Sequence, residues 1–267
     1  MPRFSRLRWL NWLSIDTVAV AVAWFSALAV YFGEPIHSWA LLVLGLSVWL
    51  TYTADRLYDI RDRTPESILS QRHRFSYKYA GPIWKIWWAL LAIDLCLAFV
   101  FLDPGSLKRG FYLLGLCLIY TGANQLLSKL FFPKELLVAI LFTAGIFVFL
   151  APPYPLMAAT VIAVICLLNC LSIGHHEASI DQAFGIHSLA TWFVPKLAHT
   201  SYALCISLTI LTTNHTLRNL LVLTLLLQWL IYTLQKHFHP EDYRVYADLA
   251  LLAGPVIFLG LPVYSAL

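Results

Sequence analysis

Charged residues are scarce in this 267-residue chain, where Asp, Glu, Lys and Arg together make up only 12% of the composition. A soluble domain usually carries about a quarter charged residues and has no single core large enough for so much apolar surface. The mean hydropathy of +0.73 and the 15% content of aromatic residues instead fit a chain dissolved in lipid, where aromatic side chains collect at both membrane interfaces. The composition therefore excludes an ordinary soluble domain and indicates a polytopic membrane protein.

Paired cysteine motifs and features of a secreted protein are also lacking. The five cysteines all lie inside apolar stretches, at positions 96, 117, 166, 170 and 205. This placement indicates buried thiols rather than disulfides or a zinc site. The arginine-containing start "MPRFSRLRWLNWLS" leads into a full-length apolar span, so we expect no cleavable signal.

Long apolar runs make up most of the sequence. Crossing roughly 30 Å of hydrocarbon takes about 17–25 apolar residues in a helix. Nine runs fit that length, and they lie at 17–33, 38–55, 83–102, 110–128, 135–151, 154–173, 191–212, 218–235 and 246–264. Because helices satisfy their own backbone hydrogen bonds in lipid, we predict an all-α bundle of nine transmembrane helices that forms one domain over residues 1–267.

Lysine and arginine are distributed unevenly over the segments between these spans. With the N-terminus inside, the outer loops hold three of the 18 cationic residues, Lys108, Arg109 and Arg218, and the inner segments hold the other fifteen. Cytoplasmic loops carry such an excess, so we predict a cytoplasmic N-terminus in a multi-pass protein of a bacterial cytoplasmic membrane. This topology accounts for the net charge of +4, and we expect no nucleic-acid partner.

Two groups of carboxylates lie in the two longest connections, both on the predicted cytoplasmic side. The stretch "TYTADRLYDIRD" holds Asp55, Asp59 and Asp62, and "NCLSIGHHEASIDQAFGIHSLA" holds Glu177 and Asp181. Residues four apart share one face of a helix, so Asp55 pairs with Asp59 if the helix runs on, and Glu177 pairs with Asp181. Two acidic pairs at the mouth of an apolar bundle repel each other unless cations lie between them. We therefore interpret both pairs as candidate metal ligands and catalytic residues.

The type of ligand indicates the cation. Carboxylates without cysteine favour Mg²⁺ over Zn²⁺, and Mg²⁺ usually binds one or two carboxylates together with water and substrate phosphate oxygens. Two such half-sites, with Asp62 as an auxiliary ligand, would hold a diphosphate, and Arg56, Arg72, Arg74 and Lys78 would neutralise the remaining charge. A long hydrocarbon on that diphosphate would explain why the site opens into a membrane-embedded cavity. There, the metal would promote ionisation of an allylic C–O bond, and aromatic faces would stabilise the carbocation.

These motifs resemble those of the UbiA superfamily of intramembrane prenyltransferases over nearly the whole chain. In that family N-x-x-x-D-x-x-x-D follows helix 2 and D-x-x-x-D follows helix 6. Thr51, Asp55 and Asp59 match the first motif, and Glu177 and Asp181 match the second. The segments "GIHSLA", "YTG" and "KELLVAILFTAG" are also similar to family segments. The resemblance implies nine transmembrane helices and Mg²⁺-dependent transfer of a polyprenyl group from its diphosphate to a lipophilic acceptor, often an aromatic quinone precursor.

The chain departs from the family pattern at several positions. Thr51 replaces the family's asparagine and Glu177 replaces an aspartate. Cys170 stands where many relatives have a further aspartate, and Asn124 stands where a lysine is common. The basic loop "SQRHRFSYKYAGP" lacks the usual Arg–Pro pair, so binding of the diphosphate would rely on the other basic residues of that loop.

Further residues are predicted to line the substrate pocket, and these are Thr51, Tyr120, Asn124, Asn169 and His176. Tyr120 would present its ring face to a carbocation, and His176 would be a polar neighbour of the phosphate site. Asp94, inside the third span, is costly in lipid and is expected to face the bundle.

Other interpretations stay open. The stretch around Asp55 would also fit a solvated helix end held by surface ion pairs. A catalytically degenerate relative would bind lipid or organise partners without turnover. His175, His176 and Glu177 would suit an intramembrane metalloenzyme, although the other histidines form no repeated short boxes. A transporter would explain the bundle, although neither an inverted repeat nor matched broken helices are visible.

Overall fold

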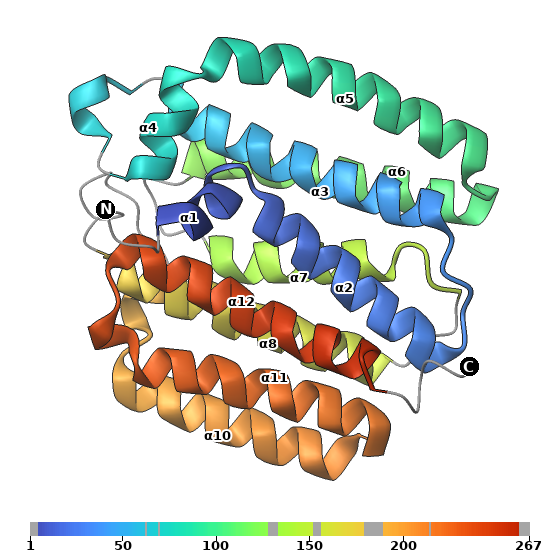
Figure 1. Cartoon of the computed structure of the whole chain (residues 1–267), viewed down its shortest axis with the longest axis vertical. Helices are drawn as coiled ribbons and strands as arrows, with labels where there is room; N and C mark the ends of the chain where they lie inside the picture. The colour runs from blue at the N-terminus through green and yellow to red at the C-terminus, as the bar shows by residue number, and fades with distance from the viewer. Residues whose placement is uncertain are drawn as a thin grey trace.

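The computed structural model describes residues 5–61, 63–68, 70–127, 133–151, 156–178, 189–213 and 215–261, and all regular structure in these ranges is helical (Figure 1). The long helices are α2 (Ile15–Phe32), α3 (Ser38–Asp59), α5 (Ala80–Phe101), α6 (Pro104–Leu127), α7 (Lys134–Phe147), α8 (Leu156–His176), α10 (Pro195–Thr212), α11 (His215–Thr233) and α12 (Pro240–Leu259). The short elements are α1 (Ser5–Trp12), η1 (Pro65–Ser67), α4 (Gln71–Lys78), η2 (Leu189–Trp192) and η3 (Gln235–His237). The prediction of an all-α chain is confirmed.

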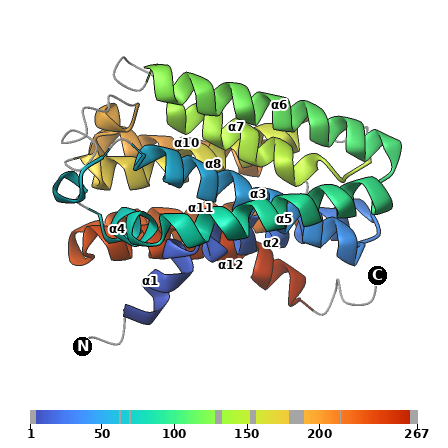
Figure 2. The ribbon, with the colours of Figure 1, turned by 90° about the horizontal axis from the view of Figure 1, so that it is seen from above.

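Helix α2 packs against α3, α7 and α12. Figure 2 shows α6 and α12 on opposite sides of the bundle. Trp24, Phe25 and Leu28 of α2 are buried in one continuous apolar core. The indole nitrogen of Trp24 donates a hydrogen bond of 3.0 Å to the carbonyl of Leu251 in α12, so this buried donor is satisfied across a helix contact.

Helices α5 and α6 reverse the usual pattern of burial. In α5 the polar residue Asp94 is buried, whereas Trp88 and Phe99 of the same helix are largely exposed. In α6, Asn124 is buried while Ile119 exposes 69% of its surface. Helices that are polar inside and apolar outside face lipid rather than water. The expectation that Asp94 faces the bundle is confirmed, because its carboxylate accepts a 2.8 Å hydrogen bond from Ser47 of α3.

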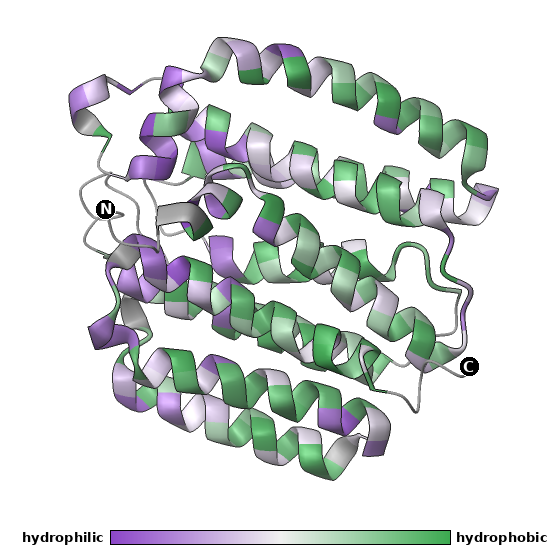
Figure 3. Ribbon diagram, in the orientation of Figure 1, coloured by the Kyte–Doolittle hydropathy of each residue, from purple (hydrophilic) through white to green (hydrophobic). Residues whose placement is uncertain are grey.

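Polar residues gather at the end of the bundle that holds α4 and the start of α12 (Figure 3). Arg8 of α1 reaches Asp242 of α12 with both Nε (2.6 Å) and Nη2 (2.8 Å). Arg56 of α3 donates to the backbone carbonyls of Asn11 (3.0 Å) and Trp12 (2.6 Å) at the end of α1. The carbonyl of Trp12 at the helix end is thereby satisfied, whereas that of Asn11 also accepts from the backbone N–H of Ser14. Both bonds of Arg56 fix α1 over this end of the bundle.

The prediction of nine transmembrane helices is only partly supported. Among the described residues, six helices are long and apolar enough to span a membrane, namely α2, α3, α5, α6, α8 and α11. The predicted spans 135–151, 191–212 and 246–264 coincide instead with α7, α10 and α12, and α7 has only 14 residues. Part of the reason lies in α12, whose first half carries four charged residues, Glu241, Asp242, Arg244 and Asp248, and two of these, Arg244 and Asp248, line a cavity.

Close contact between α11 and α12 depends on a glycine. A Cβ added at Gly254 would lie 1.9 Å from the Oγ1 of Thr224. We therefore expect Gly254→Ala to destabilise the protein by about 1–3 kcal/mol through overpacking, measured as a lower midpoint of thermal unfolding. Because Thr224→Ala removes that oxygen, the double variant should recover part of the loss. Gly122→Ala is the matched control, since nothing lies within 4 Å of its added Cβ. Equal effects of the two glycine substitutions would contradict this account of the contact.

Candidate active site

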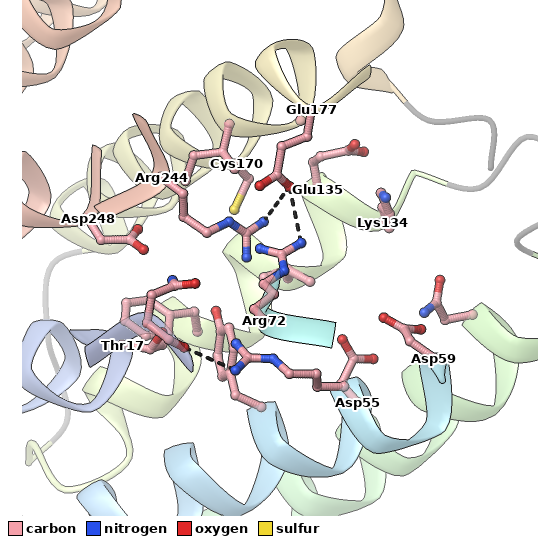
Figure 4. Close-up of a pocket in the computed structure, with 18 of the residues that line it drawn as sticks. Thr17, Asp55, Asp59, Arg72, Lys134, Glu135, Cys170, Glu177, Arg244 and Asp248 are labelled. Carbon is pink, nitrogen blue, oxygen red and sulfur yellow. Dashed lines mark hydrogen bonds and ion pairs between the residues drawn. The ribbon is translucent and has the colours of Figure 1, made fainter. Parts of the chain in front are cut away.

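A cavity of about 520 Å³ opens among the helices at the polar end of the bundle (Figure 4). Its walls come mainly from α3, α6, α7, α8 and α12, and α4 adds Arg72 and His73. Ionisable residues line it in balanced numbers, with cations at Arg56, Arg63, Arg72, Lys134 and Arg244 and carboxylates at Asp55, Asp59, Glu135, Glu177 and Asp248. Apolar side chains such as Val20, Phe142 and Leu251 line other parts of the wall. The cavity therefore combines a charged region with an apolar one.

Helix α3 presents two carboxylates to this cavity. The helix runs on past its apolar segment and ends at Asp59, which confirms the expectation that Asp55 and Asp59 share one face. One oxygen of Asp55, Oδ1, is buried and has no hydrogen-bond partner among the described residues. The Oδ2 of Asp59 lies 3.9 Å from the Nε2 of His73 in α4. Burial and the positive charges of Arg72, Arg56, Arg244 and Arg63 hold the pKa of His73 well below its usual value, so this imidazole is neutral at physiological pH.

Glu177 lies opposite α3, directly after α8, and binds two arginines. Its Oε2 is 3.1 Å from the Nη2 of Arg72 in α4 and 3.1 Å from the Nη2 of Arg244 in α12. Burial of the carboxyl group acts to raise its pKa, but the positive charges of Arg244, Arg72 and Lys134 outweigh burial, and the pKa of Glu177 is lowered. The ionised carboxylate thus draws three separate helical segments together at the cavity.

The wall formed by α12 and α8 carries a chain of polar side chains. Asn169 of α8 donates from Nδ2 to the Oδ1 of Asp248 at 2.9 Å. Gln228 of α11 in turn donates to the Oδ1 of Asn169 at 3.4 Å. Asn169 and Gln228 are buried, and Asp248 lines the cavity. The two amides thereby fix the orientation of the Asp248 carboxylate.

The structure brings together eight of the predicted site residues as cavity lining, and these are Asp55, Arg56, Asp59, Arg72, Tyr120, Asn124, Asn169 and Glu177. Asp62 and Asp181 fall outside the described residues, so the predicted pairing of Glu177 with Asp181 on one helix face stays a prediction. Arg56 touches the cavity but also holds the end of α1, as described above.

Four predicted residues do not line the cavity. The hydroxyl of Thr51 is exposed and donates to the carbonyl of Ser47. The segment 71–78 forms helix α4, and Arg72 of this helix lines the cavity. Arg74 instead donates to the carbonyl of Ile68. The Nζ of Lys78 lies 5.2 Å from the ring centroid of Tyr79. His176 lies against Tyr243, with ring centroids 4.4 Å apart.

Sequence reasoning missed five charged residues of the cavity, namely Arg63, Lys134, Glu135, Arg244 and Asp248. Their signal was present, because each is an ionisable residue at the end of an apolar segment on the predicted cytoplasmic side. Arg244 and Asp248 also have the spacing of four that drew attention to Asp55 and Asp59. Without the fold, nothing connected α7 and α12 to the acidic clusters.

The donor set fits a cation that takes few protein ligands. Among the described residues no group of three or more His, Cys, Asp or Glu side chains is arranged to hold a metal ion. However, Oδ1 of Asp55 and both carboxylate oxygens of Glu135 are buried without a hydrogen-bond partner among these residues, and buried carboxylates are normally paired or bound to metals. Such isolated carboxylates suit Mg²⁺, which completes its shell with water and phosphate oxygens.

Neither protein-family models nor curated protein sequences match the chain, but two solved structures share its fold. The apo structure of a UbiA homologue from Aeropyrum pernix K1 has a TM-score of 0.62 and 14% sequence identity, over 92% of this chain and 98% of that one. A UbiA homologue from Archaeoglobus fulgidus bound to GPP and Mg²⁺ has a TM-score of 0.60 and 14% identity, over 95% of this chain and 100% of that one. These likenesses show that the chain has the fold of the two UbiA homologues.

The ion pairs of Glu177 should make stability depend on pH. The pKa of Glu177 is lower in the folded protein than its ordinary value of 4.5, so its stabilising contribution is complete above that value and is lost as the pH falls through the folded-state pKa. We expect Glu177→Gln to destabilise the protein by about 1–3 kcal/mol at pH 7 because it leaves two neighbouring arginines without their carboxylate. In thermal unfolding experiments, the difference from wild type should shrink toward pH 3.5.

The control is Glu66→Gln, because Glu66 is exposed on η1 and lies outside the cavity. This variant should match wild type at both pH values. A difference between Glu177→Gln and wild type that is the same at pH 7 and pH 3.5 would show that the charge of Glu177 is not what stabilises this region.

Proposed function

We propose that this chain, which has the fold of the UbiA homologues, is an intramembrane prenyltransferase. It transfers a polyprenyl group from its diphosphate to a lipophilic acceptor, which we expect to be an aromatic compound similar to a quinone precursor. The observation that supports this most directly is the cavity in which Asp55 and Asp59 face Glu177 and its arginines beside an apolar region. A substrate with a diphosphate at one end and a hydrocarbon chain at the other matches both parts.

The cations of the cavity are suited to bind the diphosphate. Arg72 and Arg244 come from two different helices and are positioned by one carboxylate. The positive charge of Lys134, at the start of α7, acts on both Asp55 and Glu177. Guanidinium groups bind phosphate oxygens with charge-assisted hydrogen bonds. Arg72 stays in our assignment of the diphosphate contacts, and Arg244 and Lys134 replace Arg74 and Lys78.

Mg²⁺ is the proposed cofactor, by analogy with the homologue that binds GPP and Mg²⁺. Asp55 and Asp59 would hold one ion, and Glu177 with Asp181 would hold the other, with Asp62 as an auxiliary ligand. When bound, the metal would neutralise the charge that develops on the departing diphosphate. Glu135, whose two carboxylate oxygens have no hydrogen-bond partner among the described residues, also lines this cavity.

The apolar lining protects a cationic prenyl group from water. Tyr52, Tyr120 and Phe142 line the cavity, and aromatic faces attract positive charge. Val20 and Leu251 add aliphatic surface, which gives the hydrocarbon chain an apolar wall to bind. These side chains would bind the prenyl chain and keep solvent from the reacting carbon.

We place the cavity on the cytoplasmic face of the membrane. The end of the bundle that holds it includes Arg8, Arg61, Arg74, Lys78, Lys196 and Lys236 in addition to the cations of the cavity, whereas Lys108, Arg109 and Arg218 lie at the other end. This asymmetry supports the predicted topology of a multi-pass protein in a bacterial cytoplasmic membrane.

Loss of an α3 carboxylate should stop turnover. We expect Asp59→Asn to reduce prenyl transfer from GPP by about 100-fold or more, because the metal-assisted departure of the diphosphate loses a ligand. The measurement uses purified protein, GPP, Mg²⁺ and a membrane extract, and mass spectrometry detects an acceptor that has gained one prenyl group. EDTA should silence the wild-type protein, and added Mg²⁺ should restore it.

Glu66→Gln again provides the control, and it should retain wild-type turnover. Wild-type rates in the Asp59→Asn variant, or activity that persists in EDTA, would contradict the assignment. A wild-type protein that binds GPP but transfers it to nothing would favour the degenerate relative that binds lipid without turnover.

A further inference from the structure

A second hollow lies at the polar end of the bundle, where α3 ends and α5 begins. It has a volume of about 420 Å³, and its lining includes Leu57, Ile60, Arg61, Tyr77, Ala80 and Trp84. These residues come from the end of α3 and the turn after it, from α4 and from the start of α5, and the three helices contact one another (Figure 1). We call this hollow the α3–α5 cleft.

The α3–α5 cleft and the carboxylates of the central cavity lie on different faces of α3. Leu57 is two residues from both Asp55 and Asp59, which places it about 200° around the helix from these carboxylates. Tyr58 and Ile60 line both hollows. The end of α3 is therefore the wall that the two hollows share.

The floor of the cleft is apolar. Leu57 and Ile60 are buried, and Ala80 and Trp84 pack against them. The ring of Trp84 also meets that of Tyr58 edge-on, with ring centroids 5.9 Å apart. An inorganic anion gains nothing from such a floor, whereas the glycerol backbone and upper acyl chains of a lipid make many dispersion contacts with it.

The rim of the cleft carries a cation. Arg61 is exposed, and its guanidinium forms neither a hydrogen bond nor an ion pair with any described residue. None of the described residues that line the cleft is a carboxylate. The neighbouring Asp59 lines the central cavity instead, and Asp62 falls outside the described residues. The charge of the rim is thus complementary to an anion.

Two lysines and two tyrosines strengthen this complementarity. Lys78 and Lys85 are exposed and directly follow Tyr77 and Trp84, which line the cleft. Tyr58 and Tyr77 expose 37% and 40% of their surfaces, and their hydroxyls can donate hydrogen bonds to an anion. Lys78, which does not line the central cavity, therefore has a place beside the second hollow.

The position of the cleft indicates an amphiphilic occupant. Its α5 side belongs to a helix that turns Trp88 and Phe99 outward to lipid, while the opposite side belongs to the charged end of the bundle. Tyr and Trp side chains collect at this boundary between hydrocarbon and water. Basic pockets between transmembrane helices on the cytoplasmic side, where we place this end, bind the head groups of anionic lipids.

We propose that the α3–α5 cleft binds one anionic phospholipid of the cytoplasmic leaflet. Its phosphate lies at Arg61, and its glycerol backbone and upper acyl chains lie against Leu57 and Trp84. Such a lipid supplies both the anion that the rim lacks and the apolar surface that the floor requires. The inference is independent of prenyl transfer, although a lipid held there also supports the end of α3 that presents Asp59.

The test counts the lipids that stay bound to the full chain. The protein is placed in nanodiscs of equal parts phosphatidylglycerol and phosphatidylcholine with the same acyl chains, extracted into mild detergent and weighed by native mass spectrometry. Wild type should retain phosphatidylglycerol in preference to phosphatidylcholine. Arg61→Gln should lower the ratio of the two retained lipids about fivefold, the effect of one cation beside an anionic head group.

A second variant tests the cleft apart from its charge. Ala80 lines the cleft, so the ring of Ala80→Phe would occupy the space of the lipid while every charge is kept. This variant should lower the ratio as Arg61→Gln does. Midpoints of thermal unfolding in phosphatidylcholine alone check that both variants fold. If Ala80→Phe does not fold, Arg61→Gln decides, because it changes an exposed side chain.

Lys236→Gln is the matched control, because Lys236 is exposed on η3 at the same end of the bundle and lies outside the cleft. It should keep the wild-type ratio. An unchanged ratio in Arg61→Gln would overturn the proposal, and so would an equal decrease in Lys236→Gln, which would show attraction to surface charge alone. The same spectra report the oligomeric state. A wild-type dimer that Ala80→Phe abolishes would assign the cleft to a second copy of the chain instead of a lipid.

Discussion

One carboxylate holds the charged end of this protein together. Glu177 receives a guanidinium group from α4 and another from α12, and it stands directly after α8, so three segments distant in sequence meet at a single group. Charges are costly inside an apolar bundle unless they are paired. The cavity meets this constraint with five cations and five carboxylates along its wall. The pairing allows a strongly polar chamber to exist among helices that otherwise face lipid.

This charge balance also explains how the chamber suits a substrate with two unlike ends. The arginines and Lys134 gather near the rim because α4, α7 and α12 all present a helix end there. Below that layer, the same helices contribute Phe142 and Leu251. A diphosphate bound at the rim would therefore leave its hydrocarbon among apolar side chains. The solved UbiA homologues share the fold. In this chain, the fold brings the charged rim and the apolar wall together in one cavity.

The sequence predicted those features that depend on local periodicity or composition. The positions of the long helices follow from the apolar runs, and the common face of Asp55 and Asp59 follows from their spacing of four on a helix that continues to its end. The partners of Glu177 did not follow, because Arg72 is 105 residues away and Arg244 is 67 residues away. Arg74 and Lys78 were predicted together with Arg72 because the segment was interpreted as a loop. Once it forms α4, helical geometry turns these side chains in different directions.

The most direct test of the account is the location of divalent ions in a crystal of this protein grown with GPP and Mn²⁺. Anomalous scattering identifies Mn²⁺ positions without reference to any assumed ligand. The account predicts ordered Mn²⁺ between the α3 carboxylates and the diphosphate of GPP, with the phosphates against Arg72, Arg244 and Lys134 and the hydrocarbon beside Phe142. A diphosphate bound outside this cavity, or GPP bound within it while Mn²⁺ lies elsewhere, would contradict the account.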